Sequence, residues 1–403
     1  MRKALGWSVS VELSKTGIAA TNFLLMATLL GPASYGLYVV MAAFSALITS
    51  LATAGYSQWV QPLAKEYGLK AASSAVISLS VTISLPMLFL IGGILFASGM
   101  DNWVVLFLIV VVEAWMFPVW TSVALSLLAT GRLASYAFVA LLVPAVKLGV
   151  SVVVLVVWGM NLDEWVIVAS GFGLIGLLWT TLILARDEWT TSKYFKLWYR
   201  RGFGFAAVGS ASAISENLDR LIVGGLLGAT AAGTYGVGAR FSSYGSVPSK
   251  GLALVNYPIY FERVKGGNAS ALLADVRRAS FVGVLLGSVA GVSIVVAVLL
   301  LSGNLLSAYD QLLPTACALA AVVPLRSIQY ACGDALYALG QAKDRLAVTV
   351  LGALTTTCMT LIGAHVGGLF GASLGVVVSA LIVTILLAGA VGKGIQSLRG
   401  SAT

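Results

Sequence analysis

The sequence predicts an all-α polytopic membrane protein, with about 12 transmembrane helices in two pseudo-symmetric six-helix lobes around a central cavity. Composition, the distribution of charge and an internal repeat support this prediction. The chain has 403 residues, of which 59% are hydrophobic and 10% charged, and its mean hydropathy is +0.98. Soluble domains carry about 25% charged residues, so a soluble fold is excluded.

Apolar segments follow one another along the whole chain, and each is near or above the ~20 residues that cross a bilayer. The predicted spans are 7–30, 36–60, 71–97, 103–129, 133–157, 164–185, 204–228, 232–258, 279–302, 311–339, 346–365 and 369–391. The start Met1-Arg2-Lys3 is typical of a secretory signal, but the apolar run lasts to Leu30 and no cleavage pattern follows. We therefore expect a retained first span.

Positive charge lies between the spans on one side only. Of the 24 Lys and Arg, 18 occupy connections on the same side of the predicted membrane. They are Arg2, Lys3, Lys65, Lys70, Arg132, Arg186, Lys193, Lys196, Arg200, Arg201, Arg263, Lys265, Arg277, Arg278, Lys343, Arg345, Lys393 and Arg399. Cationic loops stay on the cytoplasmic face, so both termini are predicted to be cytoplasmic. The formal charge of +9 is thereby interpreted as membrane anchoring and not as nucleic-acid binding.

An internal repeat divides the chain. The 17 residues from Leu29 to Ser45 share nine identities with the segment from Leu226 to Ser242, at a constant offset of 197. A weaker similarity joins the segments around Gly131 and Gly340. Between the halves lies a charged, aromatic segment suited to the headgroup region. We predict lobes at 1–185 and 204–403, joined by an interfacial linker at 186–203, with a binding site between the repeats.

Several classes of function lack their motifs. The sequence contains no P-loop and no zinc-protease pattern, and Cys317, Cys332 and Cys358 have no metal-ligand spacing. We therefore expect no cofactor and no metal. His365, at the outer end of a span, is either an interfacial polar residue or a proton carrier. A chain made almost entirely of spans is most simply a carrier or channel and not an enzyme.

Eleven ionisable residues lie inside the predicted spans. The cations are Lys15, Lys147, Arg220, Arg240, Lys250 and Arg326, and the acids are Glu12, Glu113, Glu216, Asp219 and Asp334. Each would cost about 2.5–3.5 kcal/mol if it faced lipid at mid-depth. Most must therefore face a wet cavity or one another.

Helical spacing separates the charges that can pair locally from those that cannot. Glu12 with Lys15, and Glu216 with Arg220, lie on shared helix faces and can neutralise each other. Lys147 has no such partner, and neither does Glu113. We expect Lys147, Arg240 and Arg326 to line the cavity, whereas Lys250 either snorkels toward the cytoplasm or joins the site.

Two stretches resemble a known family. Leu29-Leu30-Gly31-Pro32 followed by Tyr35-Gly36-Leu37-Tyr38 is similar to the LGPxxYGLY signature of polysaccharide-biosynthesis membrane proteins. These are the O-antigen and capsule flippases (Wzx type) of the multidrug/oligosaccharidyl-lipid/polysaccharide exporter superfamily. The stretch from Asn217-Leu218-Asp219-Arg220-Leu221 to Tyr235 resembles the opening of the same family's second lobe.

The resemblance implies a flippase in the bacterial inner membrane. Its substrate would be an undecaprenyl-diphosphate-linked oligosaccharide for O-antigen, capsule or exopolysaccharide, moved to the outer leaflet by alternating access. A polysaccharide polymerase and other glycan-assembly proteins are possible partners, and no nucleic acid is expected. The expected substrate-binding cations are Arg220, Arg240, Arg326, Lys147, Lys15 and Lys250. Coupling to H⁺ or Na⁺ is open among Glu113, Glu216, Asp219, Asp334 and Glu12.

The main alternative is a drug/cation antiporter of the same superfamily. That function needs acids without neighbouring cations, a role that Glu113 could fill, and the interspersed Arg and Lys argue against it. A membrane enzyme of glycan assembly and an inactive scaffold are further alternatives. The absence of a large outer loop disfavours the enzyme, and nothing in the sequence excludes the scaffold.

Overall fold

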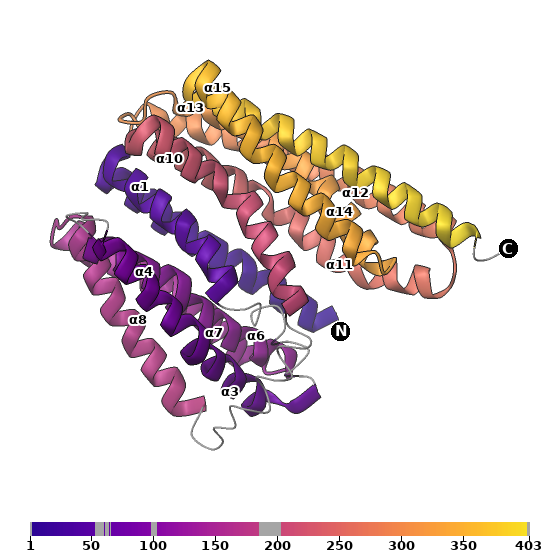
Figure 1. Ribbon diagram of the computed structural model, residues 1–403, viewed down its shortest axis with the longest axis horizontal. Coiled ribbons are helices and arrows are strands. Elements are labelled where there is room, and N and C mark those ends of the chain that lie inside the picture. Colours follow the sequence, from indigo (N-terminus) through magenta and orange to yellow (C-terminus); the bar gives the residue numbers. More distant parts are fainter. Residues whose placement is uncertain are drawn as a thin grey trace. The chain divides into compact units, whose positions relative to one another are not determined.

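The structure is a computed structural model that describes residues 2–52, 60, 64, 66–97, 103–184 and 203–400. All regular structure in these ranges is helical, as predicted (Figure 1). The chain divides into two compact units, unit 1 (Met1–Ala213) and unit 2 (Ile214–Thr403). The division falls within one helix, α10 (Phe203–Gly245). The predicted linker at 186–203 lies outside the described residues except for Phe203.

Unit 1 begins with a long helix, α1, which contains the first predicted span, 7–30, and residues 36–52 of the second. Its elements are α1 (Arg2–Ala52), α3 (Leu69–Leu79), η1 (Ser80–Ser84), α4 (Leu85–Ala97), α5 (Trp103–Val111), η2 (Val112–Met116), α6 (Phe117–Ala129), α7 (Leu133–Ser151), η3 (Val152–Val157) and α8 (Leu162–Leu184). The η elements are π-helical turns. Together α5, η2 and α6 cover the predicted span 103–129, and α7 with η3 covers 133–157.

The chain reverses at equivalent glycines in the two units. At Gly31 the backbone of α1 has φ 72° and ψ 172°, and at Gly228 α10 has φ 87° and ψ 174°. Only glycine adopts this conformation without strain. Pro32 then begins the next helical segment, where its missing N–H costs nothing. The same bend at the same offset supports the sequence repeat.

In unit 2, both α11 and α12 depart from the predicted boundaries. The predicted span 232–258 is interrupted at Ser246, after which α11 (Val247–Lys265) runs on to Lys265. The predicted span 279–302 belongs to a longer helix, α12 (Ala269–Ser302), whose N-cap Asn268 accepts a hydrogen bond from the N–H of Ala271. Hydropathy marks only the apolar part of a helix, so it misses turns that carry charge.

Two helices and one long bent helix complete unit 2. They are α13 (Leu312–Ala320), α14 (Val322–Ala338) and α15 (Ala342–Gly400), and α15 breaks at Gly367 and Gly368. Eight helical stretches in the described residues are long and apolar enough to cross a membrane. Three of them, 13–49, 210–265 and 342–398, contain an internal bend and are long enough to cross twice. This agrees with the predicted number of about 12 spans.

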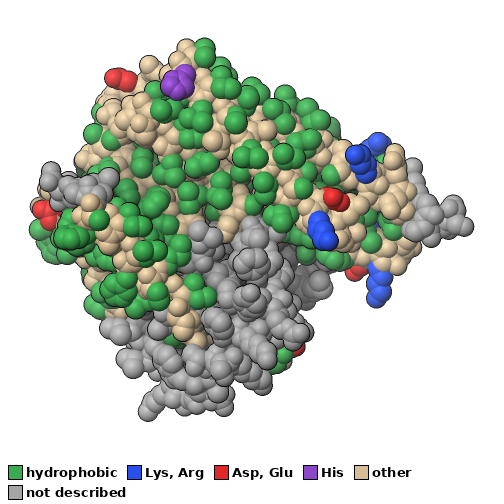
Figure 2. All heavy atoms as spheres, viewed as in Figure 1, with side chains coloured by type: hydrophobic (Ala, Val, Ile, Leu, Met, Phe, Trp, Pro, Cys, Tyr) green, Lys and Arg blue, Asp and Glu red, His purple; other side chains and the backbone are tan. Residues whose placement is uncertain are grey.

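Helix α12 shows how one helix separates lipid from core. Its outward stripe is large and exposed, and its inward stripe is small and packs on α14. The outward residues are Phe281, Leu285, Val289, Val292 and Val296, and the inward glycines are Gly283, Gly287 and Gly291. Small residues allow close contact between helix backbones in a membrane. Figure 2 shows hydrophobic side chains over the visible surface of unit 2, with Lys and Arg at the end where the C-terminus lies.

Candidate functional site

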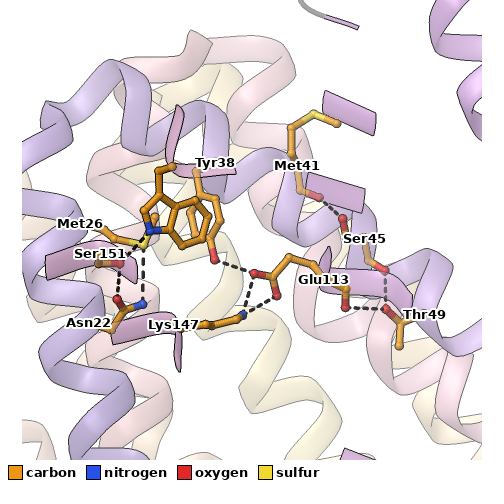
Figure 3. A network of polar contacts seen from close by, with 10 residues as sticks. Asn22, Met26, Tyr38, Met41, Ser45, Thr49, Glu113, Lys147 and Ser151 are labelled. Carbon is orange, nitrogen blue, oxygen red and sulfur yellow. Dashed lines mark hydrogen bonds and ion pairs between the residues drawn. The ribbon is translucent and has the colours of Figure 1, made fainter. Parts of the chain in front are cut away.

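Unit 1 contains a partly buried ion pair between two helices. Glu113, in the π turn η2, accepts hydrogen bonds from the Lys147 ammonium of α7 at 2.7 and 2.9 Å, one to each carboxylate oxygen. The Tyr38 hydroxyl of α1 donates to the same carboxylate at 2.9 Å (Figure 3). The Lys147 nitrogen also lies 4.0 Å from the centroid of the Phe117 ring. Lys147 and Glu113, which lack partners on their own helices, thus neutralise each other.

A π turn sets the direction of the Glu113 side chain. Pro118 has no N–H to donate to the carbonyl four residues earlier, and the wider turn η2 ends just before it. Such turns occur often at functional sites, because they rotate one stretch of side chains relative to the rest of the helix. Here the turn places Glu113 opposite α1 and α7.

A second set of hydrogen bonds fixes the surroundings of Tyr38. The Ser151 hydroxyl donates to Asn22 at 2.6 Å and accepts from the Trp165 ring N–H at 2.9 Å. The Trp165 ring meets Tyr38 edge-on, with centroids 5.6 Å apart. Helices α1, α7 and α8 are tied together by these contacts, and Tyr38 is held in place beside Glu113.

Unit 2 has a similar tyrosine–carboxylate pair, in which the carboxylate comes from a different position in the repeat. Tyr235 donates its hydroxyl hydrogen to Asp219 at 2.5 Å, and both side chains are buried. The bend at Gly228 folds α10 back so that these two residues face each other. Tyr235 is the repeat equivalent of Tyr38, whereas Asp219 is the equivalent of Asn22. Each unit therefore retains the tyrosine and takes its carboxylate from a different element.

Three arginines lie together in unit 2. Arg240 and Arg326 are close enough to Arg220 for their like charges to repel it, and Asp219 attracts it. Glu216 and Asp219 lie near Arg326. We call Arg220, Arg240 and Arg326 the arginine cluster; it outnumbers these two neighbouring acids.

Only some of the N–H groups of the Arg220 side chain donate hydrogen bonds to other described residues. Its Nη1 donates to Asn217 at 2.9 Å, and its buried Nε has no hydrogen-bond partner among the described residues. The cluster draws on both halves of α10 and on α14. Sequence analysis predicted all three arginines as site residues, and the structure brings them together.

Two other predicted site residues lie apart from the cluster. The Lys250 nitrogen is 5.8 Å from the centroid of the Tyr330 ring. Asp334 pairs with Arg345 at 3.5 Å, and Arg345 also donates to the carbonyl of Gly333 at 2.9 Å. Arg345, which was predicted to lie in a connection before span 346–365, is helical, because α15 begins at Ala342 and carries it back onto α14. Asp334 is thus engaged by a residue that span prediction had set outside the membrane.

The remaining predicted residues are less informative. Lys15 is partly buried in α1, and Glu216 and His365 are exposed. The Glu12 side chain lies outside the described part of the structure, so its pairing with Lys15 stays a prediction. No group of three or more His, Cys, Asp or Glu that could hold a metal occurs among the described residues.

Sequence reasoning missed the tyrosines and Phe117 as site residues. In the sequence, Tyr38 and Tyr235 stood out only as identical residues in the repeat. Such a match indicates a shared architecture and does not identify a residue as part of a functional site. Gln329, on α14, donates to the Ala380 carbonyl at 2.9 Å and to Thr384 at 3.1 Å. That residue holds α14 to α15.

Comparison with solved structures places this fold. One structure, described as the inward-facing conformation of a multidrug resistance MATE family transporter of the MOP superfamily, is 16% identical, with a TM-score of 0.70 over 98% of this chain and 100% of that one. The outward-facing conformation of such a transporter gives 15% identity and a TM-score of 0.65, over 99% and 96% of the two chains.

A MOP superfamily transporter from Pyrococcus furiosus, reported for a binding pocket of reverse polarity that suggests a different function, gives 15% identity and a TM-score of 0.65 over 98% and 96%. No protein-family model and no curated protein sequence matches the chain. The fold is that of MATE transporters of the MOP superfamily, and these neighbours are transporters and not enzymes.

Proposed function

We propose that the chain is an exporter whose unit 2 binds the anionic group of its substrate at the arginine cluster. The substrate we propose is an undecaprenyl-diphosphate-linked oligosaccharide, moved from the cytoplasmic to the outer leaflet of the bacterial inner membrane. The observation that carries this proposal is the gathering of Arg220, Arg240 and Arg326 from two helices of unit 2, near Glu216 and Asp219.

The chemistry of the cluster suits a diphosphate. Arginine presents a planar fork of N–H donors that can bind phosphate oxygens in pairs, and it stays charged when partly desolvated. The unpartnered Nε of Arg220 supplies a donor that an incoming oxygen can satisfy. A cationic substrate would instead meet repulsion from three guanidinium groups.

Alternating access is the mechanism that we propose for this transport. The fold is shared with a transporter captured in both inward- and outward-facing conformations. Cytoplasmic termini, coupling to H⁺ or Na⁺, and association with a polysaccharide polymerase and other glycan-assembly proteins belong to the same proposal.

Binding measurements on single variants test the role of the cluster. Arg240→Gln and Arg326→Gln should each weaken the binding of undecaprenyl diphosphate to the protein in nanodiscs by about tenfold or more, as expected for a charge-assisted hydrogen bond. Arg263→Gln is the matched control, because Arg263 is exposed and pairs with Asp275 at 2.8 Å outside the cluster. Equal affinity in all three variants would remove the cluster from the binding site.

A drug/cation antiporter is the second candidate function. The fold comparisons favour it, since neighbours with this fold are described as multidrug resistance transporters. Efflux of ethidium from a host that lacks its own pumps separates the two candidates. Energy-dependent ethidium efflux that is lost on mutation of Glu113 to Gln, with no binding of undecaprenyl diphosphate, would establish the antiporter and overturn the flippase.

A further inference from the structure

The Lys147 ammonium in unit 1 is surrounded by groups of the kind that bind a free cation. Both carboxylate oxygens of Glu113 accept from it, and the face of Phe117 lies 4.0 Å away. A carboxylate together with an aromatic face is the combination that binds ammonium groups. Glu113 and Phe117 lie four residues apart on the continuous run of η2 and α6, and Lys147 comes from α7, so the ion pair joins two helices that are separate in the sequence.

The surroundings of the carboxylate hold it in place independently of Lys147. Tyr38 donates to Glu113 at 2.9 Å, and Tyr38 is itself packed edge-on against Trp165. The Thr49 hydroxyl reaches the backbone carbonyl of Glu113 at 3.5 Å. Anchors on α1 and the π turn would therefore keep the carboxylate oriented if the ammonium were absent (Figure 3).

We propose that Glu113, Phe117 and Tyr38 form a monovalent-cation site in unit 1 whose resident cation is the Lys147 ammonium. The chain then carries its own cation at this site and needs none from solution to neutralise Glu113. This inference is independent of the proposed substrate, and it gives Lys147 a role other than substrate binding.

The repeat supports a built-in cation in each unit. The offset of 209 residues that relates Gly131 to Gly340, the glycines that end α6 and α14, also relates Phe117 to Arg326. Where unit 1 places an aromatic ring beside its tyrosine-bound carboxylate, unit 2 places a guanidinium near Asp219. Both tyrosine–carboxylate pairs are thus accompanied by a positive charge that is covalently part of the chain.

The pair is also not fully enclosed by the protein. The Lys147 and Glu113 side chains keep 19% and 17% of their surface exposed. A small organic cation can therefore enter the space left when the Lys147 side chain is shortened. Truncation of Lys147 to Ala removes the atoms of a propylammonium ion, which makes propylammonium the matched probe.

The experiment measures the melting temperature of the full chain in detergent against propylammonium concentration. The wild-type protein should show no saturable response, and Lys147→Ala should melt at lower temperature and regain a few degrees as the probe fills the site. Propan-1-ol, which has the same chain without the charge, should give no such recovery. The double variant Glu113→Gln/Lys147→Ala should lose the response.

Three outcomes decide against the proposal. A saturable response of equal size in the wild type, or one that survives in the double variant, would overturn it, and so would the absence of any response in Lys147→Ala. If Lys147→Ala does not fold, Lys147→Met keeps most of the side chain and vacates only the position of the nitrogen, so it is tested with ammonium, with the same expectations. The readout needs no transported substrate, so failure here is distinct from failure of the proposed function.

Discussion

At the scale of single residues, each unit places a tyrosine hydroxyl against a carboxylate inside the membrane-spanning helices. Tyr38 and Tyr235 occupy the same repeat position, yet their acceptors, Glu113 and Asp219, come from different elements. A buried carboxylate is costly unless hydrogen bonds and opposite charge compensate it. Retention of the tyrosine in both repeats indicates that this donor is a fixed part of the architecture, whereas the acid and its counter-ion differ.

Removal of either tyrosine hydroxyl should destabilise its unit. Tyr38→Phe and Tyr235→Phe each delete a hydrogen bond to a charged group, which we expect to cost about 1.5–3 kcal/mol and to lower the melting temperature in detergent. Tyr260→Phe is the control, since the Tyr260 hydroxyl is buried with no hydrogen-bond partner among the described residues. It should be neutral or stabilising, and equal losses in all three variants would contradict the assignment.

The sequence showed that Lys147 and Glu113 needed partners but not that they would meet. The cost of burying a charge identified both residues, and helical spacing excluded partners on their own helices. Their pairing joins residues 34 apart on different elements, and the π turn η2 rotates Glu113 away from the direction that a regular helix would give it. A periodicity of 3.6 residues contains neither piece of information.

At the scale of elements, the sharp bends were predicted as loops between spans and are found at one or two glycines within long helices. Gly31 and Gly228 were matched by the repeat, and their positive φ explains why glycine is present in both copies. The N-terminal extension of α12 and the break before α11 were not predictable from hydropathy. Those boundaries depend on capping and on charged turns, such as the one that Asn268 begins.

Substitution at the bend should cost more than substitution one turn earlier. Gly228→Ala places a side chain at φ 87°, ψ 174°, for which we expect a loss of about 1–3 kcal/mol. Gly225→Ala lies in the regular part of α10, where an added Cβ meets nothing within 4 Å. Thermal unfolding of both variants is the measurement. Equal melting temperatures would mean that the bend does not require glycine.

The contact between α12 and α14 should be sensitive to one methyl group. A Cβ at Gly287 would lie 2.8 Å from the Cα of Pro324, so Gly287→Ala must push the helices apart. We expect a cost of about 1–3 kcal/mol, as in other overpacked contacts. Gly389→Ala on α15 meets nothing within 4 Å and should unfold like the wild type. A stable Gly287→Ala protein would show that this contact is looser than described.

At the scale of the whole molecule, sequence and fold agree on a helical membrane protein with the architecture of MATE transporters. The agreement arises because span number and repeat follow from hydropathy and from residue matches, which do not depend on tertiary detail. The substrate cannot be predicted in this way, since it depends on which charged side chains meet across helices. Here the neighbours favour a drug antiporter, and the arginine cluster favours an anion.

Membrane orientation gives a prediction for the whole chain. After replacement of the three native cysteines, Asp310→Cys should react with a membrane-impermeant maleimide on intact cells, because Asp310 lies in a predicted outer connection and is exposed. Lys265→Cys, at the exposed end of α11, should react only after the cells are opened. The opposite pattern would invert the orientation that the positive charges predict.

The central claim is that the positive charge of unit 2 selects a phosphate-bearing lipid. Its most direct test is the rate at which an undecaprenyl-diphosphate-linked oligosaccharide crosses the bilayer of proteoliposomes, measured by lectin access to the sugar. The account predicts rapid crossing with the wild-type chain and loss of at least about tenfold in Arg240→Gln/Arg326→Gln, a change of at least about 1.4 kcal/mol in the barrier. The account would be contradicted if the lipid-linked oligosaccharide crossed at the same rate with the double variant. It would also be contradicted if the wild-type chain transported ethidium but did not move the lipid-linked oligosaccharide.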